Sequence, residues 1–205
     1  MFDGQGRRVL ARVESVGRER TVLAVLEREA PEASGLEIVL AQALVPAKKM
    51  DLILEKASEI GISEFVALET ERSLRVSREW SGRKIERWAR IAREATKQCK
   101  GTAVPIVRPP VRLKDWLGSA GDGQRIFLSE RGGRPLRTIL ADAGTGAGAS
   151  ARVLVVVGPT GGWSAAEEDG FRRAGFEAAS LGRRILKSET AALAAVALVA
   201  HLRDG

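Results

Sequence analysis

The chain has one cysteine, one histidine and no apolar stretch long enough to cross a bilayer. The single thiol, Cys99, excludes an internal disulfide and a cysteine-based metal cluster, so no metal site is expected. The apolar stretch from Ala191 to Leu202 is shorter than the ~20 residues of a membrane helix, and His201 interrupts it. The opening Met-Phe-Asp-Gly does not resemble a secretory signal. We therefore expect a cytoplasmic protein with no membrane partner, and no chemical role for Cys99 or His201.

Positive charge is concentrated in one central segment. The 205 residues are 44% hydrophobic, enough for one medium domain or for a small and a medium one. Residues 71–114 carry 13 basic and 4 acidic side chains, whereas residues 1–70 carry 9 and 12 and residues 115–205 carry 11 and 10. This distribution indicates an anionic partner such as RNA, with a solvated helical face as the alternative.

The first thirty residues predict a β-hairpin. Apolar and polar residues alternate over residues 8–13 and 21–26, with Ser15, Gly17 and Arg18 between them. Two strands alone are marginally stable, so this hairpin must pack on something else. Residues 30–35 are the best candidate for a linker.

From residue 36 onward, predicted strands and helices alternate, which is typical of an α/β domain with a mainly parallel sheet. The predicted strands are 36–44, 62–68, 125–128, 153–157 and a short one near Phe176. The predicted helices are 48–60, 79–99, 164–173 and 188–202, with Gly61 and Gly175 as caps. Residues 141–150 are low in complexity and predict a mobile surface loop.

The most informative stretch joins a buried strand to a helix through a glycine turn. The apolar run Val153–Val157 is followed by Gly158–Gly162, and Ser164 with Glu167 predicts a capping box. Such a turn offers backbone N–H groups to a ligand, and glycines allow close approach. It is neither a phosphate-binding loop, since no Gly-Lys-Ser/Thr follows, nor a G-x-G-x-x-G dinucleotide fingerprint.

A second segment, Leu181–Ala191, places Ile185 and Leu186 between basic residues. This segment is interpreted as a pocket wall with inward cations or as a loop with solvated arginines. Ser188 is a candidate cap of the last helix.

Four segments together resemble the small-subunit ribosomal RNA methyltransferase E family of the SPOUT (knotted) superfamily. They are residues 48–61, the turn Thr70-Glu71-Arg72-Ser73, the turn with Gly158-Pro159-Thr160-Gly161-Gly162-Trp163-Ser164, and residues 181–191. A weaker fifth match is Glu94-Ala95-Thr96-Lys97-Gln98. The matches follow one order across residues 36–200, which makes the resemblance specific.

The resemblance implies transfer of a methyl group from S-adenosylmethionine to N3 of a uridine in 16S rRNA. It implies a homodimer whose domain 36–205 ends in a deep trefoil knot, preceded by a partial PUA-like β segment over residues 1–33. The last helix, with Leu193, Val196, Ala197 and Ala200 at helical spacing, would contribute to the dimer. The alternatives are another SPOUT rRNA or tRNA methyltransferase, an RNA-binding homologue without catalysis, and a phosphate- or nucleotide-binding α/β domain.

The matched segments and the distribution of basic residues together suggest candidate site residues. Arg184 is the first candidate for the cation that stabilises the uracil anion and Arg72 the second, with Glu130 or Glu189 as candidate base. The expected cofactor-binding residues are Leu128, Ser129, Glu130, Gly158, Pro159, Gly161, Gly162, Leu181, Gly182, Ile185 and Leu186. The expected RNA-binding residues are Lys48, Lys49, Arg72, Arg75, Arg87, Lys97, Gln98, Lys100 and Lys187.

The chain departs from the family in several places. Thr160 stands where the family usually has Glu, Lys187 stands where it usually has Arg, and Cys99-Lys100 occupies a usually basic position. The front is shorter, because Asp3-Gly4-Gln5-Gly6 resembles the middle of the family's N-terminal barrel.

Overall fold

Strands and helices alternate along the chain, as the sequence predicts. The structure is a computed structural model that describes residues 2–4, 6–29, 35–74, 82–142 and 152–204. The strands after the hairpin are β3 (Glu37–Ala43), β4 (Glu64–Glu69), β5 (Ile106–Arg112), β6 (Gln124–Leu128), β7 (Arg134–Pro135), β8 (Arg152–Val157) and β9 (Glu177–Ser180). The helices are α1 (Ala47–Ile60), α2 (Gly82–Gln98), α3 (Leu113–Leu117), α4 (Leu136–Asp142), α5 (Ala165–Arg173) and α6 (Ser188–Asp204).

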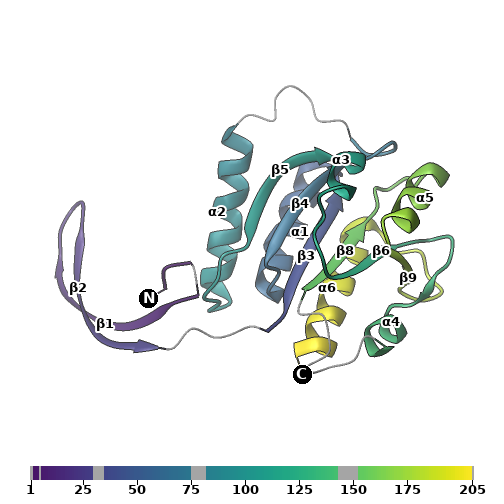
Figure 1. Cartoon of the computed structure of the whole chain (residues 1–205). Helices are drawn as coiled ribbons and strands as arrows, with labels where there is room; N and C mark the ends of the chain where they lie inside the picture. The colour runs from purple at the N-terminus through teal and green to yellow at the C-terminus, as the bar shows by residue number, and fades with distance from the viewer. Residues whose placement is uncertain (1, 5, 30–34, 75–81, 143–151, 205) are drawn as a thin grey trace.

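These seven strands form one sheet in the order β5-β4-β3-β8-β6-β9-β7, visible in Figure 1. Every pairing in it is parallel, which confirms the predicted α/β class. Parallel strands need crossover connections, and the helices between them supply these. Strand β8 lies at the centre, between β3 and β6.

Helices cover both faces of the sheet. Val153, Val155 and Val157 of β8 join a buried cluster that contains residues of α1, α2, α4 and α6. Leu154 and Val156 point into a second cluster, which contains residues of α3 and α5. Because both faces are buried, β8 is an uninterrupted apolar run rather than an alternating one.

Two predicted helix ends are confirmed. Gly61 ends α1 in the left-handed conformation, with φ of 106°, and its N–H donates to the carbonyl of Ala57 over 3.1 Å. At the start of α5, the Glu167 N–H donates to Ser164 Oγ over 3.2 Å, and the Ser164 N–H donates to the Glu167 carboxylate over 2.9 Å.

The predicted hairpin is formed by β1 (Arg8–Val16) and β2 (Thr21–Glu29), which pair antiparallel as a separate sheet. It extends away from the body in Figure 1. The chain before it contacts the body through a bridge between Gly4 and Ala103 and a 3.0 Å hydrogen bond from the Gly6 N–H to the Thr102 carbonyl. The division into units 1–33 and 36–205 stays a prediction.

Several details differ from the sequence-based expectations. Ala141 and Asp142 belong to α4 rather than to a loop, and residues 143–150 of the expected loop lie outside the described residues. Cys99 follows the end of α2 and is exposed, so it does not join the buried face of that helix. The elements β5, α3, β7 and α4 were not predicted.

Only part of the α6 face expected in the dimer is accessible, since Ala197 is exposed and Leu193 and Ala200 are partly exposed. Val196 is fully buried in the core, so it is unavailable to another subunit. The exposed large apolar residues of α6 are Leu198 and Leu202, which are 36% and 37% exposed. Among the described helices, none is both long and apolar enough to span a bilayer.

Candidate active site

Three loops at one edge of the sheet enclose a cavity of about 210 Å³. They follow the neighbouring strands β6, β8 and β9, whose carboxyl ends meet at the same edge because the strands are parallel. The start of α6 closes the remaining side. The lining residues are Leu128, Ser129, Glu130, Gly132, Val157, Gly158, Gly162, Trp163, Ala179, Ser180, Leu181, Gly182, Arg183, Arg184, Ile185, Leu186, Ser188 and Ala191.

The glycine turn after β8 is tightly packed. The Gly162 N–H donates to the Pro159 carbonyl over 3.0 Å, and Gly162 has φ of 66°. A Cβ at Gly162 would collide with the Glu130 carboxylate, and a Cβ at Gly158 would lie 3.1 Å from the Trp163 ring. A side chain at either position would therefore make its neighbour move, and the positive φ of Gly162 also favours glycine.

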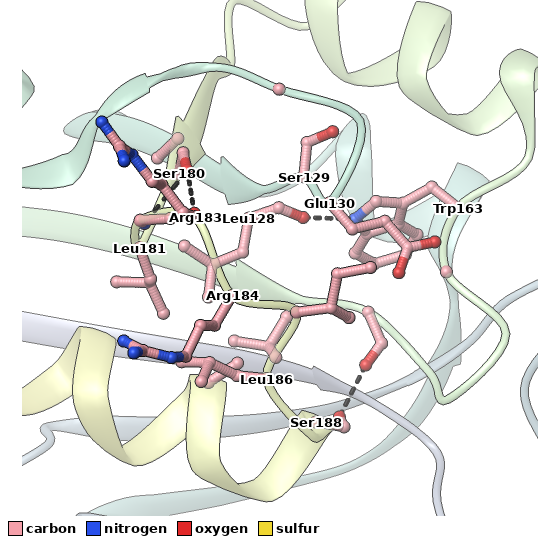
Figure 2. A pocket seen from close by; sticks show the side chains of 18 residues that line it. Leu128, Ser129, Glu130, Trp163, Ser180, Leu181, Arg183, Arg184, Leu186 and Ser188 are labelled. Atoms are coloured by element: carbon pink, nitrogen blue, oxygen red, sulfur yellow. Dashed lines mark hydrogen bonds between the residues drawn. The ribbon is translucent and has the colours of Figure 1, made fainter.

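Trp163 holds two of the loops together. Its Nε1 donates to the Leu128 carbonyl over 2.7 Å, which links the loop after β8 to the end of β6 (Figure 2). The buried indole packs edge-on against Phe171, with ring centroids 4.8 Å apart. Trp163 is thus a packing anchor with its polar N–H satisfied.

Helix α6 holds the same turn from the other side. The Ser188 hydroxyl donates to the Gly158 carbonyl over 2.6 Å, a bond drawn in Figure 2. It accepts a 2.9 Å hydrogen bond from Nε2 of Gln42, a buried residue of β3. The hydroxyl proton of Ser188 is therefore directed to the glycine turn.

Arg72 braces the outside of the turn. Its Nη1 donates to the carbonyls of Gly161 and Trp163, over 3.0 Å and 3.3 Å. The neighbouring Glu71 N–H donates to the Glu167 carboxylate over 2.7 Å. The segment Thr70–Ser73 thus packs against the glycine turn, and Arg72 does not line the cavity.

The loop after β9 contributes cations and an exposed apolar side chain. Arg183 and Arg184 are exposed, line the cavity and have no ion-pair partner among the described residues. In Figure 2 they lie on the opposite side of the cavity from Glu130 and Trp163. Ile185 is 77% exposed although it is apolar, which is typical of a surface that a ligand covers.

The two candidate bases differ in their surroundings. Glu130 lines the cavity next to Gly162. Glu189 does not line it; the backbone N–H of Glu189 itself and the Lys49 ammonium, 3.0 Å away, lower the pKa of this carboxyl. A lowered pKa makes Glu189 the weaker proton acceptor, so Glu130 is the better candidate.

Nine of the eleven expected cofactor-binding residues line the cavity. Pro159 and Gly161 do not line it. A side chain at Gly161 would contact Arg72 instead. The sequence reasoning missed Gly132, Val157, Trp163, Ala179, Ser180, Arg183, Ser188 and Ala191 among the lining residues. The glycine pair Gly132-Gly133 after a predicted strand was a signal that could have identified one of them.

Several expected RNA-binding cations are engaged within the protein. Lys49 pairs with Glu189, Arg87 with Asp51, and Lys97 with Glu94. The exposed side chains of Lys48, Gln98, Lys100 and Lys187 have no hydrogen-bond or ion-pair partner among the described residues. Arg75 lies outside the described residues. In the same described parts, no group of three or more His, Cys, Asp or Glu side chains could hold a metal ion.

Residues 32–200 match the model of the RNA methyltransferase domain family. The chain is 29% identical over 196 residues to ribosomal RNA small subunit methyltransferase E of Aquifex aeolicus, covering 95% of this chain and 82% of that protein. A crystal structure of ribosomal RNA small subunit methyltransferase E from Neisseria gonorrhoeae, bound to S-adenosylmethionine, superposes with a TM-score of 0.85 at 30% identity, over 98% of this chain and 81% of that one. A methyltransferase from Legionella pneumophila with bound S-adenosylmethionine gives a TM-score of 0.83 at 27% identity, over 97% and 80%.

Proposed function

The chain belongs to the ribosomal RNA small subunit methyltransferase E family, and from this membership we propose that it transfers a methyl group from S-adenosylmethionine to N3 of a uridine in 16S rRNA. The observation that carries the proposal is the cavity itself. Two segments with motifs of the family, after β8 and β9, converge with the loop after β6 on one space at the carboxyl edge of the sheet. We place the activity in the cytoplasm, where the small subunit is assembled.

The cavity suits S-adenosylmethionine. Leu128, Leu181 and Leu186 offer apolar surface for the adenosine part, and Ile185 would be covered by it. Gly158 and Gly162 let the ligand approach the backbone closely. When bound, S-adenosylmethionine supplies a sulfonium-linked methyl group that a nucleophile can take.

The residues of this chain would prepare the uracil. N3 carries a proton at neutral pH, so its attack requires a proton acceptor, and Glu130 is the carboxylate at the cavity. Arg184 would place its cation near the uracil oxygens and stabilise the negative charge that develops there. Arg72 would act from outside the cavity, by holding the carbonyls of the glycine turn.

The remaining parts of the proposal concern partners. Lys48, Lys100 and Lys187 are exposed cations that would contact RNA phosphates, giving affinity and salt dependence rather than sequence choice. Leu198 and Leu202 on α6 would lie in a homodimer interface. We further propose that the chain segment over residues 181–204 threads the deep trefoil knot of this superfamily.

Mapping the methylated nucleosides of 16S rRNA by mass spectrometry tests the proposal. Cells without the gene should lose one N3-methyluridine, and purified protein should restore it on their small subunits. Methylation at another position, or of another RNA, would instead support a different knotted methyltransferase. Binding of RNA without any methyl transfer would support a homologue that has lost catalysis, for which the Thr160 substitution is the feature to test.

A further inference from the structure

Two consecutive hydrogen bonds, the first buried and the second part-buried, link strand β3, helix α6 and the glycine turn. Gln42 Nε2 donates to Ser188 Oγ over 2.9 Å, and Ser188 Oγ donates to the Gly158 carbonyl over 2.6 Å. We propose that Gln42 and Ser188 are positioning residues that fix the Gly158 peptide and thereby set the affinity of the cavity for its cofactor. The inference rests on the proposed function only in taking S-adenosylmethionine as that cofactor.

The side-chain amide of Gln42 determines which atom is the donor in each of these hydrogen bonds. The side-chain nitrogen of Gln42 donates both to Ser188 Oγ and, over 2.8 Å, to the Ala43 carbonyl. A serine hydroxyl has one proton and two lone pairs. Because Gln42 already donates to the Ser188 oxygen, the single hydroxyl proton of Ser188 is donated to the Gly158 carbonyl.

The Ser188–Gly158 hydrogen bond can affect the cavity because of where Gly158 lies. Gln42 is paired in register with Val157, the last residue of β8, so the bond acts on the first peptide of the turn. Gly158 lines the cavity and is followed by Pro159, which has no N–H of its own. On its other side Gly158 lies against the Trp163 ring. The peptide is therefore held between a hydroxyl and an indole, and its carbonyl points toward Ser188 of α6.

The burial of Gln42 supports a functional reason for the amide. Gln42 is 0% exposed, and its Oε1 has no hydrogen-bond partner among the described residues. A buried polar atom without a partner costs ~1–3 kcal/mol, and an apolar residue in this strand would avoid that cost. Buried polar atoms without partners tend to occur where a residue is needed for the functional site rather than for the stability of the fold.

Calorimetric binding of S-adenosylmethionine and of its demethylated product, S-adenosylhomocysteine, tests the proposal. Ser188→Ala should weaken both about tenfold, the effect of losing one buried hydrogen bond. Ser188→Thr keeps the hydroxyl and should restore most of the affinity. In steady state, Ser188→Ala should raise KM for S-adenosylmethionine, while kcat at saturation and KM for RNA stay within about twofold of wild type.

Ser58→Ala is the matched control. The Ser58 hydroxyl is also buried and donates to a backbone carbonyl, that of Leu54, over 2.7 Å, but it lies on α1 away from the cavity. Both variants should lower Tm of the cofactor-free protein to a similar extent, and only Ser188→Ala should change cofactor affinity. Equal cofactor affinity of Ser188→Ala and wild type, with a lowered Tm, would make the bond purely structural and overturn the proposal.

A double-mutant cycle tests the role of Gln42. Gln42→Met removes the donor while keeping the volume, so it should weaken binding less than Ser188→Ala does. The double variant should bind about as weakly as Ser188→Ala alone, because Gln42 acts through Ser188. Additive losses would show that the two residues act independently and reject the relay. If wild type itself binds neither ligand, the proposed function fails; if wild type binds and Ser188→Ala binds equally well, only this inference fails.

Discussion

The glycines of the turn after β8 have different neighbours, although they are adjacent in the sequence. Gly162 lines the cavity, has a positive φ and faces the Glu130 carboxylate. A Cβ added at Gly161 would lie 3.4 Å from the Cβ of Arg72, an ordinary contact distance. A substitution at one position should therefore affect the cavity, and a substitution at the other should not.

We expect Gly162→Ala to abolish detectable binding of S-adenosylmethionine by calorimetry. The new Cβ requires an unfavourable backbone conformation and overlaps the Glu130 carboxylate, which lines the cavity and would have to move. Gly161→Ala is the control and should bind within about threefold of wild type, which corresponds to less than ~0.7 kcal/mol. Normal binding by a folded Gly162→Ala protein would exclude the turn from the cofactor site.

Arg184→Ala should lower the single-turnover rate of methyl transfer on small subunits by on the order of a hundredfold, because it removes the cation that stabilises the uracil anion. Arg183→Ala removes an equally exposed cation from the same cavity and should retain most of the rate. Cofactor and RNA affinities are measured separately for both. Equal rates for the two variants would withdraw the role assigned to Arg184.

For individual residues, the sequence could indicate those in motifs but not the distant residues that form hydrogen bonds with them. Ser188 and the glycine turn stand in recognisable segments, whereas Gln42 is one polar residue in an apolar strand. Its partner Ser188 is 146 positions away, and no periodicity reports a contact at that separation. The bracing role of Arg72 was hidden for the same reason, since the carbonyls it binds lie 89 and 91 positions further along.

Among the secondary-structure elements, α1 and α2 are joined by a polar contact that also affects how RNA binding can be tested. The Asp51 carboxylate accepts from Arg87 Nη1 over 2.6 Å and from Trp88 Nε1 over 3.1 Å. Trp88 is buried against Phe65, with ring centroids 5.5 Å apart. Because Arg87 takes part in this packing, its substitution would confuse lost stability with lost RNA binding, and Lys100 is the better residue to test.

Asp51→Ala should lower the free energy of unfolding by ~1–3 kcal/mol, since it removes the acceptor that Arg87 and the buried Trp88 share. Glu94→Ala, which removes only the exposed partner of Lys97, should leave it unchanged within experimental error, because solvent screens such a pair. Urea unfolding followed by tryptophan fluorescence measures both. A small effect of Asp51→Ala would mean that water replaces the carboxylate.

The first turn of α6 should contribute a pH dependence. The backbone N–H of Glu189 and the Lys49 ammonium lower the pKa of the Glu189 carboxyl in the folded protein. Stability from this group is therefore present above the ordinary glutamate pKa and is lost as the pH falls through the lowered one. Between about pH 5 and pH 3, wild type should lose more unfolding free energy than Glu189→Gln. Parallel pH profiles of the two proteins would contradict the assignment.

The long elements were predictable and the short or irregular ones were not. Helix α1 and strand β8 carry clear periodic or continuous apolar patterns. Strand β5 contains Pro109 and Pro110, which have no N–H to donate to a neighbouring strand. Its register with β4 shifts between Val66 and Leu68. As an edge strand it can accommodate them. Helices α3 and α4 span only Leu113–Leu117 and Leu136–Asp142, too few turns for an apolar periodicity to be recognised.

For the whole molecule, the predicted homodimer depends on the apolar residues that α6 leaves exposed. Leu198→Asp together with Leu202→Asp should convert a dimer into a monomer, as measured by light scattering at about 20 μM, because a charge in an apolar interface lacks a partner. Leu10→Asp, at an exposed apolar position of the hairpin, is the control and should leave the mass unchanged. A monomeric wild type at this concentration would contradict the proposed assembly.

The central place of β8 has a consequence for synthesis on the ribosome. Strands β3, β4 and β5 are complete before residue 113, but among the described strands β3 joins the second half of the sheet only through β8, which begins at Arg152. Until β8 emerges, the nascent chain holds an apolar strand edge without its neighbour, and such edges recruit other chains. The cavity cannot exist before then either, because its glycine turn follows β8 directly. The interval between the completion of β5 and the emergence of β8 is thus the one in which newly made copies are most exposed to misassembly and most dependent on chaperones.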